Sequence, residues 1–222
     1  MKTIRSLSLL LALMLLYVSS SAGTKKIIVN CSEPDAEIFA NGQLVGKGKG
    51  TAVLLAYTDM LVECVKTGFL VERMQFYNKP NSPIPPKTYF IKMRPDDAFE
   101  ASIKTDVANI DIELKTSKSE DEAWLLINKI LLSYIDVIEV TDKSTGYIRT
   151  AWAVQNFTQA TIRTRIIVKM GDKNPLSYKL KLVCEYSKTE SVSAKDDQSF
   201  KEWNRVLRKY EPIVTEMPSR LK

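Results

Sequence analysis

Most of this chain consists of short segments in which apolar and polar residues alternate, separated by glycine, asparagine and proline turns. This alternation is typical of strands that bury one face. Lys25–Cys31 and Ala160–Met170 are clear examples. Only two segments, one opening at Ser119 and one at Gln198–Tyr210, have the spacing of an amphipathic helix. The pattern predicts an α+β chain dominated by antiparallel sheet.

The N-terminus has the organisation of an export signal. Lys2 and Arg5 precede an apolar run, Ser6–Val18, which ends in small residues up to Ala22. The run is too short to span a membrane and has the flanks of a cleaved secretory leader. We therefore predict a signal peptide at 1–22, export to the periplasm or cell surface, and no transmembrane segment in the mature chain.

The amino-acid composition limits the kinds of catalytic, metal and nucleic-acid site that the chain can form. The chain has no histidine, the residue most often used as a general base and as a metal ligand. The formal charge of +6 falls to +4 without Lys2 and Arg5, which is too mild to indicate a nucleic-acid partner. No cofactor site and no metal site is predicted.

The three cysteines have no metal-binding or redox-motif spacing. Cys31 lacks the preceding small residue of a lipoprotein cleavage site, so no lipid anchor is expected. A Cys31–Cys64 disulfide fits an exported protein, and so do three small buried thiols that include Cys184. The odd number leaves at least one thiol free or paired between chains.

Residues 24–95 form the first predicted module. Asn41-Gly42 is a strong hairpin signal, because both residues tolerate positive φ. The expected strands are Lys25–Cys31, Ala36–Ala40, Val53–Leu55, a strand with Met60, Val62 and Cys64 inward, and Lys87–Met93.

The order of motifs in this module resembles a PEGA domain. The matching residues are Ser32, Pro34, Ala36, Ile38, Phe39, Asn41, Gly42, Gly46, Gly68 and Phe69. The sequence departs from the family at Lys47–Gly50, where a threonine-proline pair is usual, and in the long proline-rich segment 79–86. The resemblance implies a small all-β sandwich, a non-catalytic envelope module with no family active site.

Residues 100–222 form the second predicted module, after a change of composition at 94–97. Ser119 and Glu122 form a capping box at the start of a helix whose core side carries Trp124, Ile127, Ile130 and Leu131. The expected strands are Val107–Leu114, Asp136–Val140, Tyr147–Gln155 with Ile148, Trp152 and Val154 inward, Ala160–Met170 and Ser177–Tyr186.

The resulting order, β-α-β-β-β-β-α, predicts an antiparallel sheet with two helices on one face and a final helix at Gln198–Tyr210. The turn at 142–148 is similar to one found in TATA-binding-protein-like or helix-grip modules of bacterial envelope proteins. That resemblance implies no enzymatic activity.

The face opposite the predicted core is rich in cations. It carries Arg149, Arg163, Arg165, Lys169, Lys179 and Lys181. Neighbouring strands bring like charges together, which is unfavourable unless acids such as Glu139 and Glu185 or a bound anion offset them. The face is either a site for an anionic partner or an ordinary solvated sheet face with cations as edge protection.

Catalysis is not expected. The adjacent carboxylates at 96–97, 121–122 and 196–197 lie at a boundary, a helix start and a loop, and do not face each other across a substrate. The favoured function is non-catalytic binding or scaffolding in the envelope through protein–protein contacts, with sheet edges recruiting a partner strand. The alternatives are binding of an anionic polysaccharide or lipid headgroup through the basic face, and a hydrolase with an unrecognised site.

Overall fold

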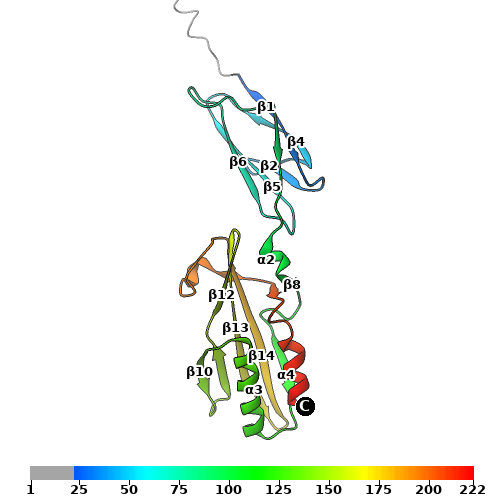
Figure 1. Ribbon diagram of the computed structural model, residues 1–222, viewed down its shortest axis with the longest axis vertical. Helices are drawn as coiled ribbons and strands as arrows, with labels where there is room; N and C mark the ends of the chain where they lie inside the picture. Colours follow the sequence, from blue (N-terminus) through cyan, green and yellow to red (C-terminus); the bar gives the residue numbers. More distant parts are fainter. Residues whose placement is uncertain (1–22) are drawn as a thin grey trace, which may run out of the picture. The chain divides into compact units, whose positions relative to one another are not determined.

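The computed structural model describes residues 23–222, so the predicted signal peptide lies outside the described residues. The chain divides into two compact units between Arg94 and Pro95. Figure 1 shows the first unit as strands alone and the second as a sheet with helices. The sheet-rich α+β class predicted from the sequence is confirmed.

The first unit is one seven-stranded sheet. Its strand order is β6-β5-β2-β3-β4-β1-β7, in which only β7 pairs in parallel, with β1. The bounds are β1 Lys25–Cys31, β2 Glu37–Ala40, β3 Gln43–Lys47, β4 Lys49–Leu54, β5 Asp59–Val65, β6 Glu72–Tyr77 and β7 Thr88–Ile91.

The two edges of this sheet meet, so that it is nearly closed. The rings of Phe76 on β6 and Tyr89 on β7 lie 5.3 Å apart in a T-shaped contact. One core cluster takes Ile27 and Val29 from β1 and Val62 from β5, which are not neighbouring strands. The closure explains how a unit this small buries a continuous core.

Two strands of the first unit were not predicted. β3 has no buried residue and β6 only Phe76, so neither shows a clear alternation of apolar residues. The predicted hairpin at Asn41-Gly42 is confirmed, with φ of 47° and 78°. Gly48 has φ of +60°, and a Cβ there would collide with the backbone of Pro34.

All three cysteines are free thiols. The Cys31 side chain is the hydrogen-bonding neighbour of Cys64 inside the first unit. Burial, and then the proximity of Cys31, raise the pKa of the Cys64 thiol to about 12. Burial raises the pKa of Cys184, in the second unit, to about 12 as well.

The second unit is built on a long hairpin, β13 Ala160–Lys173 and β14 Leu176–Ser187. β11 and β12 pair with one side of β13, and β9 and β15 with the outer side of β14. The remaining bounds are α2 Asp97–Glu100, β8 Ser102–Lys104, β9 Asp111–Lys115, α3 Glu120–Tyr134, β10 Ile138–Asp142, β11 Tyr147–Thr150, β12 Ala153–Phe157, η1 Asp197–Ser199, β15 Lys201–Glu202, β16 Arg205–Leu207 and α4 Ile213–Leu221.

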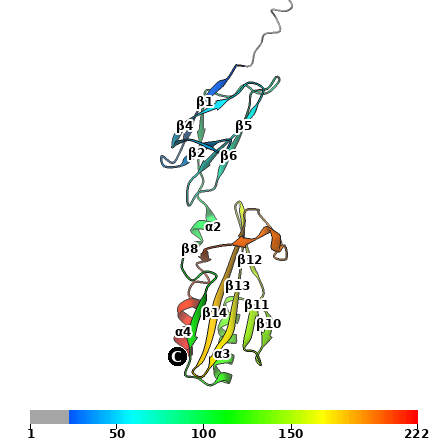
Figure 2. The same ribbon diagram turned by 180° about the vertical axis from the view of Figure 1, so that it is seen from behind.

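Helices α3 and α4 lie on one side of this sheet, as Figures 1 and 2 show from opposite directions. The capping box predicted at Ser119 and Glu122 is present, and Ile127 and Leu131 of α3 are fully buried. They pack in one core with the inward residues of the sheet, among them Ile166.

The predicted helix at Gln198–Tyr210 is wrong. The segment contains η1, β15 and β16, and β16 pairs with β8. Phe200, Val206 and Tyr210 are buried as the pattern required, but their helical spacing arises by coincidence in extended chain. Pairing with a strand about 100 residues earlier overrides a local pattern. The final helix is α4, which contains Pro218.

The predicted strand Tyr147–Gln155 is broken into β11 and β12. Arg149 pairs with Ile167 and Ala153 with Thr164, so the three residues 150–152 lie opposite two residues of β13 in a bulge. In this bulge the Thr150 hydroxyl oxygen accepts the backbone N–H of Ile166 at 3.0 Å. Trp152 consequently does not point into the core but contacts the cations of the opposite face, and Val154 is exposed. The first expected strand, Val107–Leu114, is shorter as β9, and Ile110 lies exposed outside it.

Candidate binding face of the second unit

The six predicted cations share one face of the second sheet. Lys169 on β13 is paired directly with Lys179 on β14, and Ile167 is paired with both Lys181 and Arg149. Directly paired residues point to the same side of a sheet, and side chains alternate along each strand. Arg149, Arg163, Arg165, Lys169, Lys179 and Lys181 therefore all lie opposite α3 and α4.

Acids on the same face neutralise much of this charge. Asp111 of β9 contacts Lys169 at 2.7 Å and Lys181 at 3.3 Å. The hydrogen bond from Lys169 is the main cause that holds the pKa of Asp111 below its usual value, although burial acts against it. Glu139 of β10 contacts Arg149 at 3.0 Å, as expected from the sequence. The face is therefore a mixed-charge surface and not a continuous basic tract.

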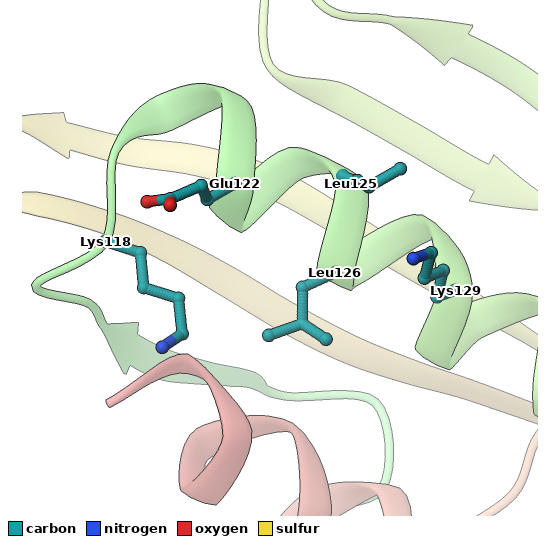
Figure 3. Close-up of a pocket in the computed structure, with 5 residues that line it drawn as sticks. All are labelled: Lys118, Glu122, Leu125, Leu126 and Lys129. Atoms are coloured by element: carbon teal, nitrogen blue, oxygen red, sulfur yellow. The ribbon is translucent and has the colours of Figure 1, made fainter.

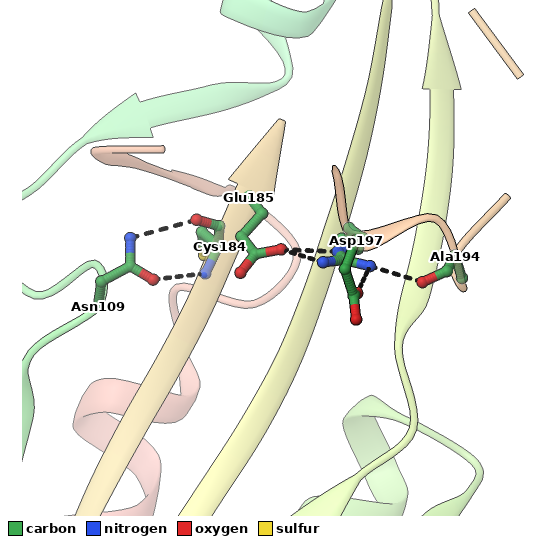
Figure 4. A network of polar contacts seen from close by, with 6 residues as sticks. Asn109, Cys184, Glu185, Ala194 and Asp197 are labelled. Atoms are coloured by element: carbon green, nitrogen blue, oxygen red, sulfur yellow. Dashed lines mark hydrogen bonds and ion pairs between the residues drawn. The ribbon is translucent and has the colours of Figure 1, made fainter. Parts of the chain in front are cut away.

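Arg163 does not belong to an uncovered face, contrary to the prediction, because its side chain is only 3% exposed. Its guanidinium donates to Glu185 at 2.7 Å and to the carbonyl of Ala194 at 2.6 Å, and contacts Asp197 at 2.7 Å. Figure 4 shows this network, with Ala194 and Asp197 reaching in from the loop that follows β14. Arg163 fastens that loop to the sheet and cannot take an external anion.

A column of alternating rings and guanidinium groups runs along this face. The Arg163 guanidinium carbon lies 4.2 Å from the ring centroids of both Phe200 and Trp152. The Arg165 guanidinium lies 4.1 Å from the same Trp152 ring. The column therefore runs Phe200, Arg163, Trp152, Arg165, and each contact is a cation–π interaction at short range.

Arg165 closes this column without an acid beside it. Within residues 23–222 it makes no ion pair within 4.0 Å, and its Nε is buried with no hydrogen-bond acceptor. Burial, and then the positive charge of Arg149, lower the pKa of Arg165. The Nε of Arg149 is also buried without an acceptor, although the terminal nitrogen of Arg149 reaches Glu139. Two adjacent guanidinium groups thus have unused donors.

A second surface feature is a shallow hollow of about 280 Å³ beside α3, lined by Lys118, Glu122, Leu125, Leu126 and Lys129 (Figure 3). The Ser119 hydroxyl and backbone N–H donate to the Glu122 carboxylate, and these bonds lower its pKa. Because Glu122 is engaged in the capping box, it is not poised as a general acid or base.

The other carboxylates noted in the sequence have structural partners. Asp96 caps α2 by accepting from the backbone N–H groups of Ala98 and Phe99, and Asp97 accepts from Thr158. Asp197 pairs with Arg163. Within residues 23–222 no group of acids and cysteines is arranged to hold a metal ion. No helix in that range is long and apolar enough to cross a membrane.

Sequence reasoning found the cations but missed the aromatic side chains that organise them. The alternation predicts Trp152 in the core, in step with Ile148, and a helical stripe predicts the same for Phe200. The available signal was the crowding of arginines at 163 and 165, which requires a neighbouring ring or acid to be tolerated in a sheet.

Comparisons of the chain with protein-family models, with curated proteins and with solved structures return no match. Function is therefore inferred from the chemistry of the face and from the sequence.

Proposed function

We propose that this chain is an exported, non-catalytic binding protein of the bacterial envelope, and that it holds a partner protein on the open end of the cation-bearing face. The open end consists of Arg149, Trp152 and Arg165. The observation that carries the proposal is the Trp152–Arg165 stack, which ends beside a second arginine with its Nε unsatisfied. Tryptophan and arginine fixed in place by packing are typical of the residues that dominate protein–protein binding energy.

The sheet edges are weaker candidates for recruiting a partner strand. The β10 edge carries a register shift between Ile138 and Val140, and irregular edges pair poorly. On the β6 edge, Arg73 is occupied by an ion pair with Glu63. We therefore place the contact on the face and not on an edge.

The first unit contributes a module that we propose to be PEGA-like, a small β-sandwich that presents or spaces the binding unit. Its nearly closed sheet, the Asn41-Gly42 hairpin and the constrained Gly48 turn support that proposal. The leader-like sequence at 1–22 supports export, without a lipid anchor, to the periplasm or cell surface.

The test is a pull-down from envelope extract in which the wash is varied from low to high salt. We expect a protein partner that survives high salt, is lost with Trp152→Ala and is lost with Arg165→Glu. Lys129→Glu is the matched control, because it reverses a charge on α3, on the other side of the sheet. Capture that persists in a folded Trp152→Ala protein contradicts the proposal. So does recovery only of salt-released glycan or lipid.

A further inference from the structure

The geometry points to a site for one carboxylate between Arg149 and Arg165, and we propose that its occupant is an acidic side chain of the partner protein. The inference rests on the proposed function and names the chemistry of the contact. It starts from an imbalance on the face, where Arg149 is paired with Ile167, two residues from Arg165 on the same side of the sheet. Glu139 contacts Arg149 at 3.0 Å, whereas Glu185 and Glu139 act on Arg165 only from beyond ion-pair distance.

The donors are of the right kind and are held in place. A carboxylate accepts two parallel N–H bonds from a guanidinium, and this planar match is specific to arginine. Arg165 is fixed by the Trp152 ring at 4.1 Å and Arg149 by Glu139 at 3.0 Å, so little side-chain entropy remains to be lost on binding.

The surroundings favour a single acid over an anionic polymer. Lys169 and Lys181 are engaged by Asp111, Arg149 is engaged by Glu139 and Arg163 is covered, so Arg165 and Lys179 are the cations of this face without an ion pair among residues 23–222. A uronic polysaccharide or an anionic membrane requires several free cations in a row, whereas Lys179 lies opposite Lys169, four residues along β13 from Arg165. The exposed Val154 on the neighbouring β12 suits an apolar residue adjacent to the acid in a protein segment.

The experiment is a titration of ¹⁵N-labelled protein, in which the Nε–H signals of Arg149 and Arg165 are followed by NMR. The probe is an acetylated and amidated peptide, Val-Thr-Glu-Thr-Val, and its counterpart with glutamine in place of glutamate is the control. We expect the glutamate peptide to shift both signals to saturation and the glutamine peptide to bind at least 10-fold more weakly.

Variants separate the site from general electrostatics. Arg149→Gln and Arg165→Gln are each expected to weaken the glutamate peptide at least 10-fold, while Lys179→Gln changes its affinity less than twofold. Arg165→Lys keeps the charge but loses the planar pair of donors, so we expect weaker binding there too. An equal loss with Lys179→Gln, or equal binding of the two peptides, overturns the site.

Two further probes test the rejected occupants. The first probe is vesicles of phosphatidylglycerol and phosphatidylcholine, and the second is polygalacturonate. If either binds more tightly than the glutamate peptide and shifts the same two signals, the assignment of the site to a protein partner is wrong. If the peptide shifts neither signal, the carboxylate site is wrong even where the pull-down captures a partner. If the peptide binds and nothing is captured, the site holds and the proposed function fails.

Discussion

Arg163 and Arg165 are two residues apart on β13, point to the same face and contact the same tryptophan ring, yet their environments are opposite. Arg163 is covered and has two acids and a carbonyl around it. Arg165 has no acid within ion-pair distance and a second arginine nearby. The loop after β14 makes the difference, since it closes over one end of the column and stops short of the other. Strand periodicity thus assigns a face to a residue, but loop placement decides whether the residue is a structural support or a contact.

The largest expected effect comes from the covered end. Arg163→Ala leaves Glu185 without its partner and releases the loop from the sheet, so we expect the free energy of unfolding to fall by about 3 kcal/mol. Urea denaturation measures this, with Lys179→Ala as a control that should change stability by less than about 0.5 kcal/mol. A loss below about 1 kcal/mol for Arg163→Ala would mean that the covered end is not held by this residue.

Removing the Trp152 ring, which both arginines contact, should lower the free energy of unfolding by a smaller amount. Trp152→Ala removes contacts to both guanidinium groups, each worth about 0.5–1 kcal/mol, together with some apolar burial. We expect a total of about 2 kcal/mol in urea denaturation. A double-mutant cycle with Arg163→Lys should show a coupling of about 1 kcal/mol, and additive losses would refute the column as an energetic unit.

The ion pairs of Asp111 with Lys169 and Lys181 should contribute about 0.5 kcal/mol to the free energy of unfolding, because they are partly exposed. This contribution depends on pH. Lys169 and Lys181 depress the pKa of Asp111 in the folded state. The stabilisation is therefore complete above the unfolded pKa of about 4 and disappears as the pH falls through the lower folded pKa. Wild-type protein should lose more stability than Asp111→Asn between pH 5 and pH 2. Parallel curves of stability against pH for the two proteins would show that folding does not lower the pKa of Asp111.

Much of the fold could be predicted from the sequence because it is encoded locally. β1, the Asn41-Gly42 hairpin and the capping box of α3 each depend on residues within a few positions of one another. β16 pairs with β8, about 100 residues away, and its local spacing indicated a helix instead. Such a pairing cannot be predicted from local periodicity.

Some parts of the candidate site could also be predicted from the sequence and others could not. The six cations could be predicted from alternation, and Glu139 and Glu185 from the need for counter-charge. The position of the Trp152 ring between the arginines could not, because one extra residue at 150–152, opposite β13, turns Trp152 out of the core. A bulge of one residue reverses the side to which the following residues point without changing the apolar pattern of the sequence.

The smallest expected effect is also the sharpest contrast with Arg163. Arg165→Gln loses one cation–π contact but relieves the repulsion from Arg149 and the burial of an unsatisfied Nε. These contributions oppose each other, so the free energy of unfolding should change by less than about 0.5 kcal/mol in urea denaturation, while binding of the glutamate peptide is lost. A loss near that of Arg163→Ala would show that Arg165 is structural. The two ends of the column would then not differ in role. If Arg165 serves to bind a partner, Arg165→Gln should leave the free energy of unfolding unchanged and abolish binding of the glutamate peptide.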